Sequence, residues 1–155
     1  MNDLKVSIQT QDFDVAQLQR ELGSLDTTGA IASFTGLVRS NNADRQVAVM
    51  ELEHYPGMTE RSIEKIMAEA SQRWQLQAIR VVHRVGALRP GEQIVYVGVA
   101  SGHRGDAFAA CEFVMDYLKT RAPFWKKELT SAGEHWVEER TSDQHSAQRW
   151  GASPK

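Results

Sequence analysis

GDAFAACEFVMDYLKTRAPFWKKE, residues 105–128, joins a helical apolar pattern to a short basic and aromatic segment. Its apolar side chains recur at steps of three and four residues: Phe108, Cys111, Val114, Met115 and Leu118. This spacing predicts a helix over residues 105–119. Pro123 cannot continue a helix, and it pushes the residue before it toward extended backbone. The stretch therefore predicts a helix that ends near Lys119 and a strand that starts just after Pro123.

Shorter patterns on both sides of this stretch predict the other elements. We expect helices near 15–22 and 59–74, and strands near 6–8, 29–38, 47–55, 79–85, 94–100, 124–129 and 135–138. Thr59 is the expected N-cap of the second helix. Residues 29–38 are expected to form a buried strand that pairs in antiparallel fashion with 47–55 across the polar loop 40–46.

Strands that follow one another through short turns indicate mostly antiparallel sheets, so the predicted class is α+β. The length of 155 residues suits one domain, expected over 1–140, followed by a polar tail at 141–155 with a turn or two of helix ending near Trp150. Hydrophobic residues make up 41% and charged residues 25%, which is typical of a globular protein.

Charge and cysteine content exclude several classes of function. The net charge of −2 offers no general attraction to nucleic acid or to an anionic membrane. No apolar run approaches the roughly 20 residues of a membrane span, and the N-terminus lacks a signal-peptide pattern. A single cysteine excludes an internal disulfide framework and fits the reducing cytoplasm. Metal-binding spacings are absent and the five histidines are scattered, so we expect no metal and no cofactor.

Five cationic or titratable side chains lie at the ends of predicted elements, where functional groups are commonly displayed: Arg39, His103, Arg104, Lys119 and Lys126. His103 and Arg104 would also meet the free N–H groups of a helix N-terminus, an arrangement that binds phosphate. The chain has neither a Walker loop nor a dinucleotide fingerprint. The cations alone therefore indicate an anion site of unspecified chemistry.

Each of these residues also has a structural interpretation. Arg39 could flank a loop, and His103 could cap a helix. The segment 119–128 could be a basic last turn followed by a solvated edge strand. His83 is expected to lie on a strand face rather than to bind a ligand. Cys111 lies on the apolar stripe, so we expect a buried, unreactive thiol.

Five blocks in order resemble the large, catalytic subunits of molybdopterin synthase. They are GAIASFTGLVR (29–39), ELEHYPGMTE (51–60), HRVGALRPGE (83–92), VGVASGHR (97–104) and MDYLKTRAPFWKKE (115–128). The resemblance implies an α/β hammerhead fold with an added antiparallel subdomain. It implies that cyclic pyranopterin monophosphate is converted to molybdopterin by installing two sulfurs on adjacent carbons.

The same resemblance implies particular partners. The sulfur would arrive as a thiocarboxylate on the C-terminal glycine of a small ubiquitin-like subunit, whose tail enters the pocket of the large subunit. Two large subunits would form a homodimer with a small subunit at each end, a heterotetramer. No nucleic acid or membrane partner is implied.

Site residues follow from the resemblance position by position. Lys119 and Lys126 match the essential lysines. The substrate-binding positions match Leu37, Val38, Arg39, His103, Arg104, Lys119, Lys126, Lys127 and Glu128, with backbone contacts expected at 37–38 and 127–128. Phe34 and Met115 match pocket-lining residues. Arg140 could also reach the site, including from the other subunit of the dimer.

A mechanism follows for an anionic substrate and an anionic tail. Lys119 is the expected proton-transfer or intermediate-stabilising group, because lysine gives up its proton more readily than arginine. Lys126 is expected to position the phosphate or the thiocarboxylate. Since Cys111 is expected to be inert, the sulfur must come from outside the chain.

Three other functions use the same cations. A binding module would hold a phosphorylated metabolite without turnover. A nucleic-acid-binding protein would stack bases on Phe124 and Trp125, although the net charge and the lack of a basic stripe argue against it. A scaffold would grip the acidic C-terminal tail of a partner without chemistry.

Overall fold

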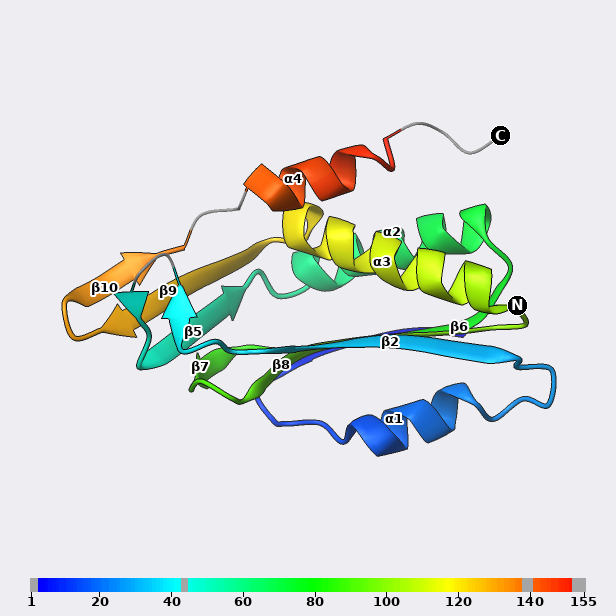
Figure 1. The fold of residues 1–155 in the computed structure, drawn as a ribbon, viewed down its shortest axis with the longest axis horizontal. Coiled ribbons are helices and arrows are strands. Elements are labelled where there is room, and N and C mark those ends of the chain that lie inside the picture. The colour runs from blue at the N-terminus through cyan, green and yellow to red at the C-terminus, as the bar shows by residue number, and fades with distance from the viewer. Residues whose placement is uncertain (1–2, 43–44, 138–140, 152–155) are drawn as a thin grey trace.

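The computed structural model describes residues 3–42, 45–137 and 141–151. Its larger sheet has the strand order β1-β6-β8-β2. These strands are Asp3–Gln9 (β1), Leu76–Arg84 (β6), Gln93–Ser101 (β8) and Ala30–Leu37 (β2). Helix α1, Val15–Leu22, covers one face, and α2, Met58–Arg73, and α3, Arg104–Arg121, cover the other (Figure 1). The first sheet is therefore buried between helices on both faces.

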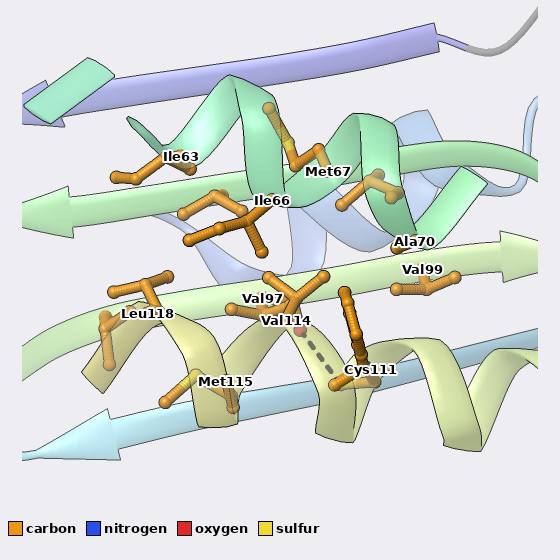
Figure 2. Close-up of a cluster of buried hydrophobic side chains, with 14 of the residues drawn as sticks. Ile63, Ile66, Met67, Ala70, Val97, Val99, Cys111, Val114, Met115 and Leu118 are labelled. Carbon is orange, nitrogen blue, oxygen red and sulfur yellow. Dashed lines mark hydrogen bonds between the residues drawn. The ribbon is translucent and has the colours of Figure 1, made fainter. Parts of the chain in front are cut away.

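The two central strands are almost entirely buried, which explains their continuous apolar sequence. Ile79 and Val81 of β6 belong to the main core with α2 and α3, while Ala78 and Val82 belong to a smaller cluster with Leu22 of α1. Figure 2 shows the main core, in which apolar side chains of α2 and α3 pack together on the face of β8 that carries Val97. The helix residues are Ile63, Ile66, Met67, Val114 and Leu118.

A second sheet, with strand order β10-β9-β5-β7, extends from one end of the first (Figure 1). Its strands are Gly133–Trp136 (β10), Phe124–Thr130 (β9), Val49–His54 (β5) and Gly86–Leu88 (β7). Two short strands, β3 (Asn41–Asn42) and β4 (Arg45–Gln46), pair with each other. All described strand pairs are antiparallel except β1 with β6. The predicted α+β class, with an added antiparallel sheet, is confirmed.

Two strand predictions are wrong. Residues 29–38 do not form a buried strand paired with 47–55, because β2 lies at the sheet edge against β8. Phe34 and Leu37 on β2 are 42% and 55% exposed. The other predicted partner, β5, pairs with β7 and β9 in the second sheet. The intervening loop forms its own short pairing, β3 with β4, and this carries the chain from one sheet to the other.

The predicted N-cap of α2 is also wrong. Gly57, with φ of +83°, is the N-cap, and its N–H donates to the Glu60 carboxylate at 2.7 Å. Thr59 lies inside the helix, where its buried hydroxyl accepts from Tyr55 N and donates to Pro123 O, both at 2.9 Å. The Thr59 side chain therefore ties the start of α2 to the chain that follows α3.

The C-terminal tail contains the expected short helix, α4, Thr141–Gln148, which lies along α3 (Figure 1). Just after it, the Trp150 ring packs edge-on against Trp74 and Phe113, and its Nε1 donates to Asp116 at 2.6 Å. Among the described residues, no helix is long and apolar enough to cross a membrane.

Candidate active site

A pocket of about 610 Å³ lies where the C-terminal end of α3 meets the end of β2 and the second sheet. Its polar lining includes Arg39, His83, Lys119, Lys126 and Glu128. Its apolar lining includes Phe34, Leu37, Val38, Met50, Ile94, Met115, Leu118 and Phe124. The pocket is therefore cationic in part and apolar in part.

The break between α3 and β9 places both lysines on this pocket. Ala122 has extended backbone, φ −88° and ψ 130°, as a residue before proline prefers. β9 then runs between β5 and β10 and is not a sheet edge, so the alternative of a solvated edge strand is wrong. Side chains alternate along a strand, and Phe124, Lys126 and Glu128 line the pocket.

Lys127 has its side chain on the opposite face of β9. Its Nζ lies 3.9 Å from Glu51 and 3.7 Å from Glu134, and it sits 5.1 Å from the centre of the Trp136 ring. The Lys127 side chain is absent from the described pocket lining. A substrate contact at Lys127 would therefore have to use its backbone.

Arg39 reaches the pocket from the chain that continues β2. The pairing of β2 with β8 shifts register between Gly36 and Leu37. A Cβ on Gly36 would lie only 2.8 Å from Val95 Cγ1, so this irregularity requires glycine. Beyond it, Val38 N donates to Glu92 O at 2.9 Å, and Gly91 N donates to Val38 O at 2.8 Å. The turn before β8 thus holds the residue next to Arg39.

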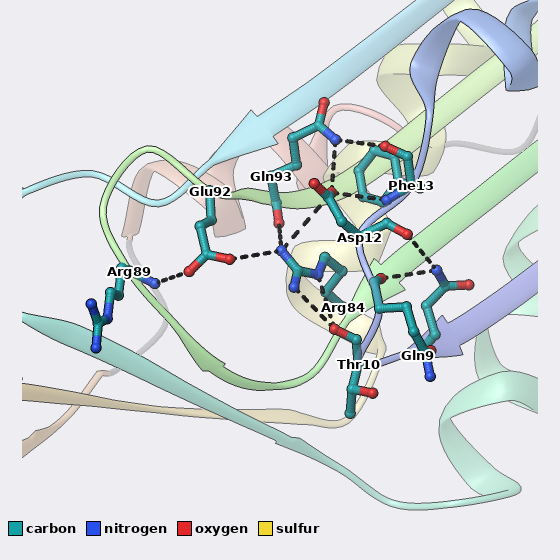
Figure 3. Close-up of polar contacts among 9 residues, drawn as sticks. Gln9, Thr10, Asp12, Phe13, Arg84, Arg89, Glu92 and Gln93 are labelled. Carbon is teal, nitrogen blue, oxygen red and sulfur yellow. Dashed lines mark hydrogen bonds and ion pairs between the residues drawn. The ribbon is translucent and has the colours of Figure 1, made fainter.

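A polar network around buried Arg84 fixes that turn (Figure 3). The guanidinium donates to Thr10 O at 3.0 and 3.2 Å, to Gln93 O at 3.1 Å and to the Glu92 carboxylate at 3.3 Å. The same Glu92 carboxylate accepts from Arg89 N at 2.7 Å, which holds its pKa below the usual value. Arg84 therefore joins the chain after β1 to the turn that supports Val38.

Two buried titratable groups belong to the pocket. Glu128 has no exposed surface, although it is part of the same pocket lining as the two lysines. His83 is 5% exposed, and its ring stacks on Phe124 with centres 3.9 Å apart and planes 18° apart. Burial lowers the pKa of His83 to about 4. His83 does lie on a strand face as expected, but its place in the pocket was missed, because sequence spacing does not show which strand end faces a cavity.

His103 and Arg104 lie at the opposite end of α3 from Lys119. Sixteen residues of helix separate His103 from Lys119, or about 24 Å at 1.5 Å per residue. Both side chains are exposed, and neither lines the described pocket. Within a single chain, Arg39, Lys119 and Lys126 therefore line one pocket, and His103 and Arg104 lie far from it. Arg140 lies outside the described residues.

Cys111 is buried, and its Sγ lies 3.7 Å from Val97 O (Figure 2). Burial raises its pKa to about 12, so the thiolate is disfavoured. The prediction of a buried, poorly reactive thiol is confirmed. In the part of the chain the structure describes, no group of three or more His, Cys, Asp or Glu side chains could hold a metal ion.

The chemistry this pocket can perform is anion binding and proton transfer. Arg39 can grip a phosphate or carboxylate with a planar fork of donors, and two lysines add mobile charge. The apolar walls around Met115 and Phe124 keep water away from part of the occupant and strengthen those interactions.

Comparisons with known proteins agree along the chain. The family model described as MoaE protein matches residues 8–121. A molybdopterin synthase catalytic subunit from Vibrio cholerae is 54% identical over 148 residues, covering 96% of this chain and 99% of that protein. The solved structure of the molybdopterin biosynthesis MoaE protein from Burkholderia ambifaria is 52% identical, with a TM-score of 0.82, and covers 99% of this chain and 100% of its own.

A more distant structure shares the fold. It is named as a protein–protein complex of subunits 1 and 2 of the molybdopterin-converting factor from Helicobacter pylori. The matched chain is 20% identical, with a TM-score of 0.72, and the match covers 88% of this chain and 91% of that one. The family model and the two closely similar proteins nevertheless suffice: this chain belongs to the MoaE family, the catalytic subunits of molybdopterin synthase.

Proposed function

We propose that this chain converts cyclic pyranopterin monophosphate to molybdopterin, as a sulfurtransferase in the cytoplasm. Two sulfurs would be transferred from the C-terminal thiocarboxylate of a small ubiquitin-like subunit. The observation that carries this proposal is the convergence of Arg39, Lys119 and Lys126 on one pocket that also has apolar walls. A flat heterocycle with a phosphate needs both kinds of surface.

The residues divide the work by their chemistry. Arg39 and Lys126 hold the phosphate and the anionic end of the partner's tail. Lys119, which lines the pocket from the last turn of α3, transfers protons or stabilises the developing charge as the cyclic phosphate opens. The sulfur comes from the partner, because burial and a pKa of about 12 make Cys111 a poor carrier.

The proposed assembly is a homodimer of large subunits with a small subunit at each end. The Helicobacter pylori structure, named as a complex of two subunits, supports a two-component enzyme. The distance along α3 between Lys119 and the pair His103 and Arg104 gives a chemical reason for the dimer. If His103 and Arg104 contact the same substrate as Lys119, a second copy of the chain must bring them, and the same holds for any cross-dimer role of Arg140.

Reconstitution tests the proposed function. Purified chain is mixed with cyclic pyranopterin monophosphate and a thiocarboxylated small subunit, and dithiolene product is followed for wild type and Lys119→Ala. We expect product from wild type and a loss of at least about 100-fold in the folded variant. Arg121→Ala is the matched control. It also removes a cation from the C-terminal end of α3, but Arg121 forms an ion pair with Glu69. Wild type that binds the small subunit but forms no product would support a binding module or scaffold.

A further inference from the structure

His83 is a pocket residue to which the proposed sulfur transfer gives no role. It stands near the end of β6 and lines the pocket together with Phe124 of β9. The 3.9 Å stack between the two rings fixes the plane of the imidazole. The imidazole ring can therefore adopt few orientations, and its nitrogen atoms are held in place before any ligand binds.

The hydrogen bonding of the ring identifies its protonated nitrogen. His83 Nδ1 lies 2.8 Å from the carbonyl oxygen of Arg84. A carbonyl oxygen only accepts, so Nδ1 must carry the hydrogen. Burial, together with the nearby positive charge of Lys126, lowers the pKa of His83 to about 4, and the ring is neutral near pH 7. Nε2 is then left with a lone pair and can accept a hydrogen bond.

A neutral ring acceptor complements the cations of the pocket. Arg39, Lys119 and Lys126 can only donate and carry positive charge, which suits a phosphate. His83 lies beside apolar walls that include Met50 and Phe124. A flat heterocycle with N–H groups needs such a combination of an apolar surface and a fixed acceptor.

We propose that His83 determines specificity for the heterocyclic part of the substrate, with Nε2 accepting a hydrogen bond from a pterin N–H. This inference rests on the proposed function, because it takes a pterin phosphate as the occupant. The pocket then recognises its substrate at two places: cations bind the phosphate, and His83 identifies the ring. A site that requires an N–H group rejects analogues that lack it, because the acceptor would be left unpaired.

Ligand binding to the full chain tests whether His83 recognises the ring while the cations bind the phosphate. Neopterin, a pterin without phosphate, and inorganic phosphate are titrated separately into wild type, His83→Asn and Lys126→Ala. Asparagine can keep a donor for Arg84 O but lacks the atom in the place of Nε2. We expect His83→Asn to weaken neopterin binding roughly threefold to tenfold and to leave phosphate binding within about twofold. Lys126→Ala should show the reverse pattern. His54→Asn is the matched control, since His54 lies outside the described lining.

A second measurement varies the ligand. Wild type should discriminate by a similar factor against at least one pterin methylated on a nitrogen, and His83→Asn should lose that discrimination. Equal wild-type affinity for neopterin and all N-methylated pterins would overturn the proposal, as would unchanged neopterin binding in folded His83→Asn. Normal turnover in the reconstitution assay alongside either result would leave the proposed function standing. Wild type that neither binds neopterin nor forms product would overturn both.

Discussion

Lys119 lies on the last turn of α3 and lines the pocket. A substitution at this position can test its positive charge separately from its ability to transfer a proton. Lys119→Arg keeps the charge, but a guanidinium does not give up its proton. We expect turnover to fall by at least about 100-fold while substrate affinity changes only a few-fold. Steady-state kinetics on the reconstituted complex measure both. Near-normal turnover would show that charge alone suffices at this position.

Cys111 is the residue whose substitution should spare the chemistry. Cys111→Ser places a hydroxyl in an apolar site near Val97 O and should lower the free energy of unfolding by roughly 1–2 kcal/mol. Sulfur transfer should remain within about twofold of wild type. Urea unfolding and the reconstitution assay measure the two effects, and an inactive but folded variant would contradict an external sulfur source.

His83 should make stability depend on pH in a defined window. Its pKa is about 4 in the fold and near 6.5 in an unfolded chain, so between these values only the unfolded state binds the proton. The stabilisation is complete above pH 6.5 and is lost as the pH falls toward 4, by roughly 3 kcal/mol in total.

His83→Phe should remove this dependence, because phenylalanine can keep the stack on Phe124 without titrating. The difference in unfolding free energy between wild type and variant is measured in urea at pH 7.5, 5.5 and 4.5. Asp3, Asp12 and Glu92, whose pKa values are also lowered, destabilise both proteins in acid and cancel in the difference. A difference that does not change with pH would show that His83 is protonated in the fold.

At the scale of elements, the turn before β8 supports the strand end that carries Arg39. Its Gly91 and Glu92 exchange backbone hydrogen bonds with Val38, while the Glu92 carboxylate binds Arg84 and Arg89 N. Glu92→Ala should loosen this support and raise the KM for the pterin substrate roughly threefold to tenfold, with a smaller change in kcat. Glu112→Ala is the control, because it removes an exposed carboxylate that pairs with Arg149. Equal effects of the two variants on KM would exclude a positioning role for the turn.

At the scale of the whole molecule, the length of α3 separates two halves of the expected cation set. If a second copy completes the site, a mixture of inactive Lys119→Ala and inactive Arg104→Ala chains should regain activity, because one site in each mixed dimer is intact. With random pairing the recovery is about a quarter of the wild-type activity. The chains are unfolded and refolded together before the assay. No recovery, with mixed dimers present, would show that Arg104 does not act across the dimer.

The positions of most helices and strands could be predicted from the sequence, because periodicity and proline or glycine signals are local. The helix over 104–121 and its stop before Pro123 are examples. Strand partners were harder to predict. β2 was expected beside its neighbour in the chain, but it pairs with β8, because the short β3–β4 pairing turns the chain into another sheet.

The sequence by itself determined the α+β class, the buried thiol of Cys111 and the cations that stand at element ends, since each follows from residue type and short-range spacing. Only the tertiary structure decided which of these groups share a pocket. It joined Arg39, Lys119 and Lys126 with Glu128, added His83, and left His103 and Arg104 roughly 22–24 Å from Lys119 along α3. The reason is that a site is assembled by contacts between distant segments, and the path of the chain between them is set by packing and not by local preference.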